Sequence, residues 1–151
     1  MEIKDGTKAL SQVRELIEEY TAKLQRDLSF QHLEEELSDL SSKYAPPHGV
    51  LLLAEENGTA LGIAAYCRHT ASRCEMKRLY VRPQARGRSL GETLVRHLLA
   101  QAAADGYTEM VLDTIEPLQV AIHLYEKLGF QRCEPYYHNP MPDVVYMKKQ
   151  L

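Results

Sequence analysis

LYVRPQARGRSLG, residues 79–91, carries the strongest structural signal in this chain of 151 residues. An apolar strand runs into a proline, and two glycines, a serine and two arginines then lead into a helix whose apolar residues recur every three or four positions. The first amides of a helix have no intrahelical partner and lie at the positive end of its dipole. Glycine and serine let a phosphate approach such amides closely, and Arg86 and Arg88 add positive charge. The stretch therefore predicts an anion-binding turn between a strand and a helix.

Two common phosphate-binding motifs are absent from residues 79–91. A Walker loop needs Gly-Lys-Ser or Gly-Lys-Thr after a four-residue gap, and a dinucleotide fingerprint needs Gly-x-Gly-x-x-Gly. Neither pattern occurs here. A nucleotide hydrolase stays open as an alternative, and so does a basic turn that binds no ligand.

Working outward, strands and helices are expected on both sides of this turn. Before it we expect a helix over 7–26 with Thr7 as its cap and a helix over 30–40 with Ser29 as its N-cap. A loop over 44–49 should follow, then strands over 50–54 and 61–66 around an Asn57-Gly58 turn, and a strand over 74–81. After it we expect a helix over 88–104, a strand over 109–113, a helix from Pro117 that ends at Gly129, and strands over 130–133 and 143–148 around a loop over 135–142. A hairpin followed by strand-helix-strand units predicts an α/β or α+β fold, with helices packed on a mixed sheet.

Composition and charge narrow the classes of function. The formal net charge of −3 argues against nucleic-acid binding, which depends on neutralising phosphates. No apolar run approaches the roughly 18 residues of a membrane span, and no signal peptide is evident, so we expect a soluble cytoplasmic protein with a single domain over residues 1–151. The cysteines form no C-x-x-C pair, which favours reduced thiols and no metal site; they are Cys67, Cys74 and Cys133.

Two motifs together resemble those of the GNAT superfamily, the acyl-CoA-dependent N-acetyltransferases. Arg86-Gly87-Arg88-Ser89-Leu90-Gly91 is similar to the family's pyrophosphate loop, Arg/Gln-x-x-Gly-x-Gly/Ala. AIHLYEKLGF, residues 121–130, resembles the family's late helix, in which a tyrosine precedes a Gly-Phe exit into the next strand. The resemblance covers residues 50–134. Ser89 stands where the family usually has glycine, and Leu118 stands where many members have asparagine.

The resemblance implies a fold and a co-substrate. The fold is a mixed, mostly antiparallel sheet of six to seven strands with helices on both faces and a splay between two central strands. The co-substrate is acetyl-CoA, without a metal. Its diphosphate would bind the main chain of Arg86, Gly87, Arg88, Ser89, Leu90 and Gly91, and its pantetheine arm would pair with the backbone of Leu79, Tyr80 and Val81. One N–H group of that strand would stabilise the oxyanion that forms during transfer.

The resemblance also implies direct attack of an amine on the thioester within a ternary complex. The family places a general-acid tyrosine at the position of Tyr125, where a phenol would protonate the leaving thiolate. An alkyl ammonium has a pKa of about 10.4, so a proton must leave before attack. Glu75, at the start of the strand that leads to the turn, is our candidate base, and the alternative is a structural partner for Lys77 or Arg78. Three further candidates for the base are His69, His123 and His138.

The acceptor is expected to be a primary amine of a small molecule. Loops often define substrates, and two loops are rich in aromatic and polar residues. Tyr44 and Tyr137 are the predicted substrate contacts, near Pro46, Pro47, Tyr136 and Asn139. Two alternatives remain: an acetyltransferase for protein lysines or amino termini, and a non-catalytic acyl-CoA-binding or regulatory module. A homodimer is possible.

Overall fold

The computed structural model describes residues 1–26 and 32–151 and contains one seven-stranded sheet with the strand order β1-β2-β3-β4-β5-β7-β6. The strands are β1 (Glu2–Asp5), β2 (Val50–Glu56), β3 (Thr59–Arg68), β4 (Arg73–Val81), β5 (Glu109–Ile115), β6 (Gln131–Arg132) and β7 (Val144–Gln150). All neighbours are antiparallel except β4 and β5, which are parallel. The predicted mixed, mostly antiparallel sheet is therefore confirmed.

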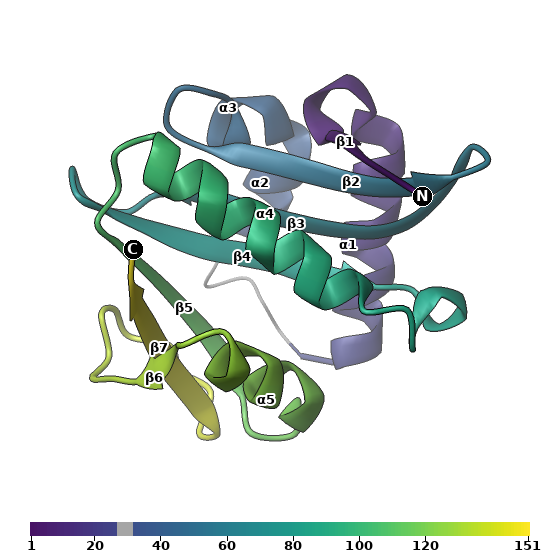
Figure 1. Ribbon diagram of the computed structural model, residues 1–151. Helices are drawn as coiled ribbons and strands as arrows, with labels where there is room; N and C mark the ends of the chain where they lie inside the picture. Colours follow the sequence, from purple (N-terminus) through teal and green to yellow (C-terminus); the bar gives the residue numbers. More distant parts are fainter. Residues whose placement is uncertain (27–31) are drawn as a thin grey trace.

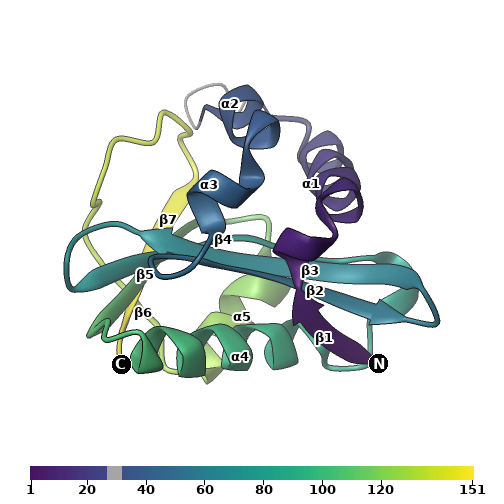
Figure 2. The same cartoon turned by 90° about the horizontal axis from the view of Figure 1, so that it is seen from above.

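Helices cover both faces of the sheet. The helices are α1 (Leu10–Leu24), α2 (Leu33–Ser38), α3 (Leu40–Tyr44), α4 (Leu90–Ala104) and α5 (Gln119–Lys127), with short 3₁₀ turns η1 (Gly6–Lys8) and η3 (Pro83–Ala85). Figure 2 shows α1, α2 and α3 on one side of the sheet and α4 and α5 on the other. Each side has its own apolar core, centred on Leu16, Ile17 and Tyr44 in the first and on Leu94, Leu98 and Met110 in the second.

Two sequence-based boundaries near the amino terminus are wrong. The single helix expected over 30–40 is two helices, because Asp39 leaves the helical region and its side chain accepts from the amide of Ser42 at 3.2 Å to cap α3. The proposed cap Ser29 and the start at Phe30 lie outside the described residues. Thr7 is not a cap, since it lies within η1 and its own amide donates to Asp5 at 2.9 Å.

The sequence analysis also missed β1, which pairs with β2 at one edge of the sheet. Its residues, Glu2-Ile3-Lys4-Asp5, contain one apolar side chain, because an edge strand can leave most of its side chains in water. That residues 1–151 make up one independently folding domain stays a prediction.

The two central strands separate. The pairing of β4 with β5 ends at Glu75 and Val111, and beyond that pair the strands diverge (Figure 1). The register between β3 and β4 shifts between Ile63 and Ala65, and Arg78 in the same stretch has a φ of 62°. A β-bulge bends its strand and increases the local twist, which accounts for β4 turning away from β5. The bulge is therefore a local cause of the predicted splay between β4 and β5.

Candidate active site

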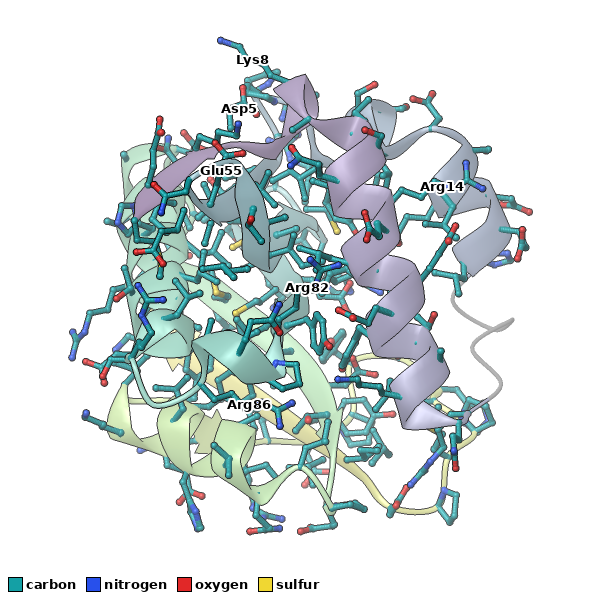
Figure 3. The ribbon with its side chains drawn as sticks, turned by 90° about the vertical axis from the view of Figure 1, so that its right-hand side faces the viewer. Asp5, Lys8, Arg14, Glu55, Arg82 and Arg86 are labelled. Carbon is teal, nitrogen blue, oxygen red and sulfur yellow. The ribbon has the colours of Figure 1, made fainter. Side chains whose placement is uncertain are left out.

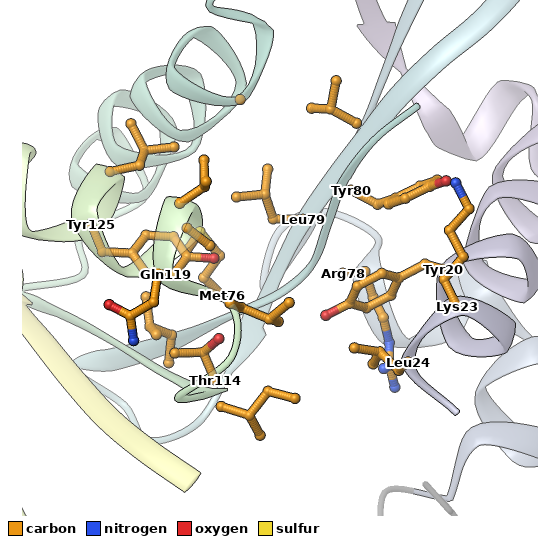
Figure 4. Close-up of a pocket in the computed structure, with 18 of the residues that line it drawn as sticks. Tyr20, Lys23, Leu24, Met76, Arg78, Leu79, Tyr80, Thr114, Gln119 and Tyr125 are labelled. Carbon is orange, nitrogen blue, oxygen red and sulfur yellow. The ribbon is translucent and has the colours of Figure 1, made fainter. Parts of the chain in front are cut away.

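A cleft of about 880 Å³ passes through the sheet at the splay. Figure 4 shows its two walls: Tyr125 and Gln119 of α5 lie on one side of β4, and Tyr20, Lys23 and Leu24 of α1 lie on the other. The cleft also reaches the turn before α4, where it is lined by Arg86, Gly87, Ser89, Leu90 and Gly91. We call the part next to this turn and α5 the cofactor half, and the part between α1, β5 and residues 139–141 the acceptor half.

The cofactor half ends in a row of amides without acceptors. The first backbone bond into α4 runs from the amide of Thr93 to the carbonyl of Ser89. Across the ranges 1–26 and 32–151, no acceptor is found for the amides from Gly87 to Glu92, and the Ser89 side chain does not cap the helix. Gly87 and Ser89 both have positive φ, of 82° and 57°. The arrangement fits a diphosphate, which would supply oxygen acceptors for these amides.

The arginines around the turn have different roles. Arg86 lines the cleft, and its role in binding a diphosphate stays a prediction. Arg88 does not line it, because its guanidinium donates two 2.9 Å hydrogen bonds to Glu56 on β2. Arg82 contacts Glu15 and Glu19 and so ties the end of β4 to α1. Figure 3 shows Arg82 beside α1, with Arg86 below it in the view. The main chain and Arg86 therefore remain available to an anion.

The edge of β4 that faces the splay is unpaired along the cleft. Leu79 and Val81 pack against the core on the α4 side, while Tyr80 packs against the core on the α1 side. Because the pairing with β5 stops at Glu75, the backbone groups of these residues that face β5 meet no strand. Such an edge offers hydrogen bonds to an extended ligand, in the way that a peptide adds to a sheet.

Tyr125 lies between the two halves. Its side chain lines the cleft but is only 6% exposed, and its ring packs edge-on against Phe130 with centroids 5.8 Å apart. Burial raises the pKa of the phenol, and the negative charge of Asp113 raises it further. The phenol of Tyr125 therefore keeps its proton at neutral pH, and the raised pKa also makes it a weaker acid.

The acceptor half is built from side chains of widely separated segments. They are Tyr20, Lys23, Leu24 and Arg26 near the end of α1, Lys77 and Arg78 of β4, Asp113 of β5, and Asn139 and Met141 of the loop before β7. Arg26 donates to both carboxylate oxygens of Asp143, at 2.8 and 2.9 Å, and joins α1 to that loop. The sequence analysis missed the α1 residues and Asp113. Tyr20 and Leu24 fell in the apolar stripe of a helix, which predicts core.

Arg78 is fixed by a buried ion pair under this half. Its Nε and Nη2 lie 2.8 and 3.0 Å from the two carboxylate oxygens of Glu36, which Lys43 also contacts at 2.7 Å. Burial alone would raise the pKa of Glu36, but the hydrogen bonds and charge of Arg78 outweigh it and lower the pKa to about 2. The pair joins α2 to the bulge of β4.

Glu75 and Tyr44 are not brought into the cleft. Glu75 belongs to the last pair of β4 with β5, where its carboxylate accepts from the Tyr136 hydroxyl at 2.6 Å and lies 3.9 Å from Lys77 Nζ. Tyr44 is fully buried beside the Glu36–Arg78 pair, because α3 directs it under the sheet. The three candidate histidines, His69, His123 and His138, do not line the cleft either.

Tyr137 reaches the acceptor half indirectly. It does not line the cleft, but its hydroxyl donates to Asp113, which does. Asn139, named in the sequence analysis only as a neighbour of Tyr137, lines the cleft itself and donates to the same carboxylate at 2.7 Å.

Among the described residues, no group of three or more His, Cys, Asp or Glu side chains could hold a metal ion. In the same ranges, no helix is long and apolar enough to cross a bilayer.

Comparison with known proteins gives concordant findings. The family model described as Acetyltransferase (GNAT) family matches residues 10–130. An uncharacterized N-acetyltransferase of Schizosaccharomyces pombe is 46% identical over 144 residues, which cover 94% of this chain and 88% of that protein. A crystal structure of an acetyltransferase from Streptococcus agalactiae aligns over 99% of this chain and 98% of its own, with 26% identity and a TM-score of 0.81. An aminoglycoside 6'-N-acetyltransferase complexed with coenzyme A shares the fold, with 17% identity, a TM-score of 0.73 and coverage of 99% and 97%.

Proposed function

Since this chain belongs to the acetyltransferase (GNAT) family, we propose that it transfers an acetyl group from acetyl-CoA to a primary amine of a small molecule, by direct attack in a ternary complex. The observation that carries the proposal is one continuous cleft, with unsatisfied amides at one end, an unpaired strand edge along it and a buried tyrosine between its halves. When bound, acetyl-CoA supplies an acyl group activated as a thioester.

The cofactor half supplies the binding groups for this co-substrate. The amides from Gly87 to Glu92, together with Arg86, would hold the diphosphate at the start of α4. The unpaired edge at Leu79, Tyr80 and Val81 would hold the amide-containing arm of the coenzyme by main-chain hydrogen bonds. An N–H group on that edge is also suited to stabilise negative charge on the thioester oxygen during attack.

Tyr125 is the proposed general acid. The leaving thiolate resembles that of cysteine, whose pKa is about 8.5, so a nearby phenol can return a proton to it. Tyr125 is protonated, lines the cleft and lies on the helix that follows β5. A non-catalytic acyl-CoA-binding module has no need of a proton donor there. Substitution of Tyr125 therefore distinguishes an acetyltransferase from such a module.

We favour a small-molecule acceptor because an ion pair joins two segments that border the acceptor half. The Arg26–Asp143 ion pair connects α1 to the loop before β7, and the cleft reaches both segments. A protein chain would need an open groove across these elements. A homodimer stays a prediction.

The test combines binding and transfer. Calorimetric titration should give saturable binding of acetyl-CoA without magnesium, and acetyl-CoA consumption should depend on an amine from a panel of amino acids, polyamines, aminoglycosides, arylamines and lysine peptides. Tyr125→Phe should slow transfer about 100-fold with little change in acetyl-CoA affinity. Tyr107→Phe is the matched control, because Tyr107 is equally buried, donates to the carbonyl of His48 at 2.8 Å and lies outside the cleft. Absence of acetyl-CoA binding, or equal turnover of both variants, would contradict the proposal.

A further inference from the structure

Asp113 is a carboxylate in the cleft that was not expected from the sequence. It lies on β5 just beyond the point where β4 departs, and it lines the acceptor half. The Tyr137 hydroxyl and the Asn139 side-chain amide both donate to Oδ2, the latter at 2.7 Å. Oδ1 receives no donor from the described part of the chain. The carboxylate is thus held in place through Oδ2, while Oδ1 meets no donor from residues 1–26 and 32–151.

The loop that holds Asp113 is itself fixed. The Tyr146 hydroxyl donates to the carbonyl of Tyr137 at 2.9 Å and accepts from the amide of Asn139 at 3.1 Å. Asn139 is 8% exposed. Tyr146 lies opposite Asp113 in the pairing of β5 with β7, so one strand pair determines both the carboxylate and its two donors. The Asp113 carboxylate and its two donors are therefore held in position by hydrogen bonds of the fold.

Within the described residues Asp113 makes no ion pair, although Lys23, Arg26, Lys77 and Arg78 line the same half of the cleft. Its two donors are neutral, and in residues 1–26 and 32–151 no cation lies within 4.0 Å of it. The other carboxylates near this cleft are paired with cations: Glu36 with Arg78 and Lys43, Asp143 with Arg26, Glu75 with Lys77, and Glu92 with Arg96 and Lys127. A half-buried anion with only neutral donors is a favourable site for a cation from outside.

Asp113 also lies near both walls. It lines the same cleft as Tyr20 of α1 and Tyr125 of α5. An amine next to it would therefore lie in the cleft that also holds the proposed proton donor.

We propose that Asp113 is the acceptor anchor of this enzyme: its Oδ1 accepts a hydrogen bond from the N–H of an alkyl amine, with Tyr137 and Asn139 as positioning residues. The inference rests on the proposed acetyl transfer and specifies its acceptor as an aliphatic amine that is cationic in solution. An arylamine, which is neutral near pH 7, gains less from a carboxylate at this position.

The acceptor must lose a proton before it attacks, because an alkyl ammonium has a pKa of about 10.4 and its nitrogen has no free electron pair. That proton passes to water, and Asp113 acts as an electrostatic anchor. The neutral amine still donates an N–H to Oδ1. As its nitrogen attacks and becomes positive, the fixed carboxylate stabilises the developing charge.

The first experiment detects the anchor without turnover. In ¹⁵N-labelled protein saturated with coenzyme A, the Asn139 side-chain amide reports on the Asp113 carboxylate. Titration with n-butylammonium chloride should shift this signal saturably, whereas sodium chloride at equal ionic strength should not. The response should be lost in Asp113→Asn and kept in Glu126→Gln, a matched change of an exposed α5 carboxylate outside the cleft. An equal response in Asp113→Asn would overturn the proposal.

The second experiment measures transfer to n-butylamine. Asp113→Asn should lower kcat/KM about 10- to 100-fold, the effect of losing a hydrogen bond to a charged group. Tyr137→Phe keeps the carboxylate and removes one donor, so it should lower kcat/KM about threefold to tenfold. It also keeps the proposal testable if Asp113→Asn unfolds. If Glu75→Gln loses more activity than Asp113→Asn, the anchor is wrong and Glu75 is favoured.

Acetyl-CoA titration of each variant separates this inference from the proposed function. Loss of acetyl-CoA binding by the unsubstituted protein would refute the proposed function. Normal acetyl-CoA binding without any n-butylammonium response at Asn139 would refute only the role of Asp113.

Discussion

The two halves of the cleft are built from different parts of the polypeptide. The cofactor half consists mainly of backbone: the amides from Gly87 to Glu92 and the unpaired edge of β4. The acceptor half consists of side chains fixed by ion pairs and hydrogen bonds, among them Glu36–Arg78, Arg26–Asp143 and the donors to Asp113. A backbone site tolerates exchange of many side chains, whereas a side-chain site changes its chemistry with a single substitution. One fold can thus keep a common co-substrate and still differ in its acceptor.

The largest expected effect comes from breaking the buried ion pair under the acceptor half. Glu36→Gln leaves the Arg78 guanidinium buried without its anion, and loss of one partner of such a pair costs about 3–5 kcal/mol of the free energy of unfolding. Urea unfolding of Glu36→Gln and of the unsubstituted protein measures this loss of free energy. Glu35→Gln, on the same helix but exposed, should change stability by less than about 0.5 kcal/mol. Equal midpoints for the two variants would show that the pair does not stabilise this half.

The Glu36–Arg78 pair also predicts how its contribution to the free energy of unfolding depends on pH. The pKa of Glu36 is about 2 in the folded protein against an ordinary value of 4.5, so its contribution is complete above about pH 4.5 and is lost as the pH falls towards 2. The difference in unfolding free energy between the unsubstituted protein and Glu36→Gln should therefore shrink over that interval. Chemical denaturation at several pH values measures the difference, and a constant difference would contradict the assignment.

A smaller effect is expected from the two arginines of the cofactor half. Arg86→Gln should weaken acetyl-CoA binding about fivefold, because Arg86 lines the cleft but the amides carry most of the contact. Arg88→Gln should change it less than about twofold, because Arg88 is directed to Glu56. Calorimetry at low salt compares the two dissociation constants. If Arg88→Gln binds more weakly than Arg86→Gln, side chains contribute more to this half than we infer.

The smallest effect is expected from Ser89→Gly. Ser89 has a φ of 57°, a conformation that costs a residue with a Cβ roughly 1–2 kcal/mol, while glycine loses roughly 0.5–1 kcal/mol of backbone entropy on folding. The net gain of roughly 0.5–1 kcal/mol should raise the Tm by about 1–3 °C. Ser89→Ala keeps the Cβ and should gain nothing. A lower Tm for Ser89→Gly would show that the hydroxyl contributes more than the strain costs.

The two halves also differ in how far the sequence predicts them. The turn before α4 was predictable, because proline fixes φ at the end of a strand and glycine allows the positive φ of a tight turn before a helix. The acceptor half was not. Asp113 is an ordinary polar residue at the end of a strand in the sequence, and its importance arises from a loop that folds back across 26 residues to supply Asn139. The bulge at Arg78 has no local signal either, since arginine seldom adopts positive φ.

The Arg26–Asp143 ion pair joins positions that are 117 residues apart. Between them lie strands β2 to β6, including the turn and the splay, and Arg26 itself lines the acceptor half. On the proposed function, acceptor selectivity would be a long-range property of this polypeptide. A terminal extension, fusion or deletion that displaces either segment would alter which amines are accepted, even where coenzyme recognition stays intact.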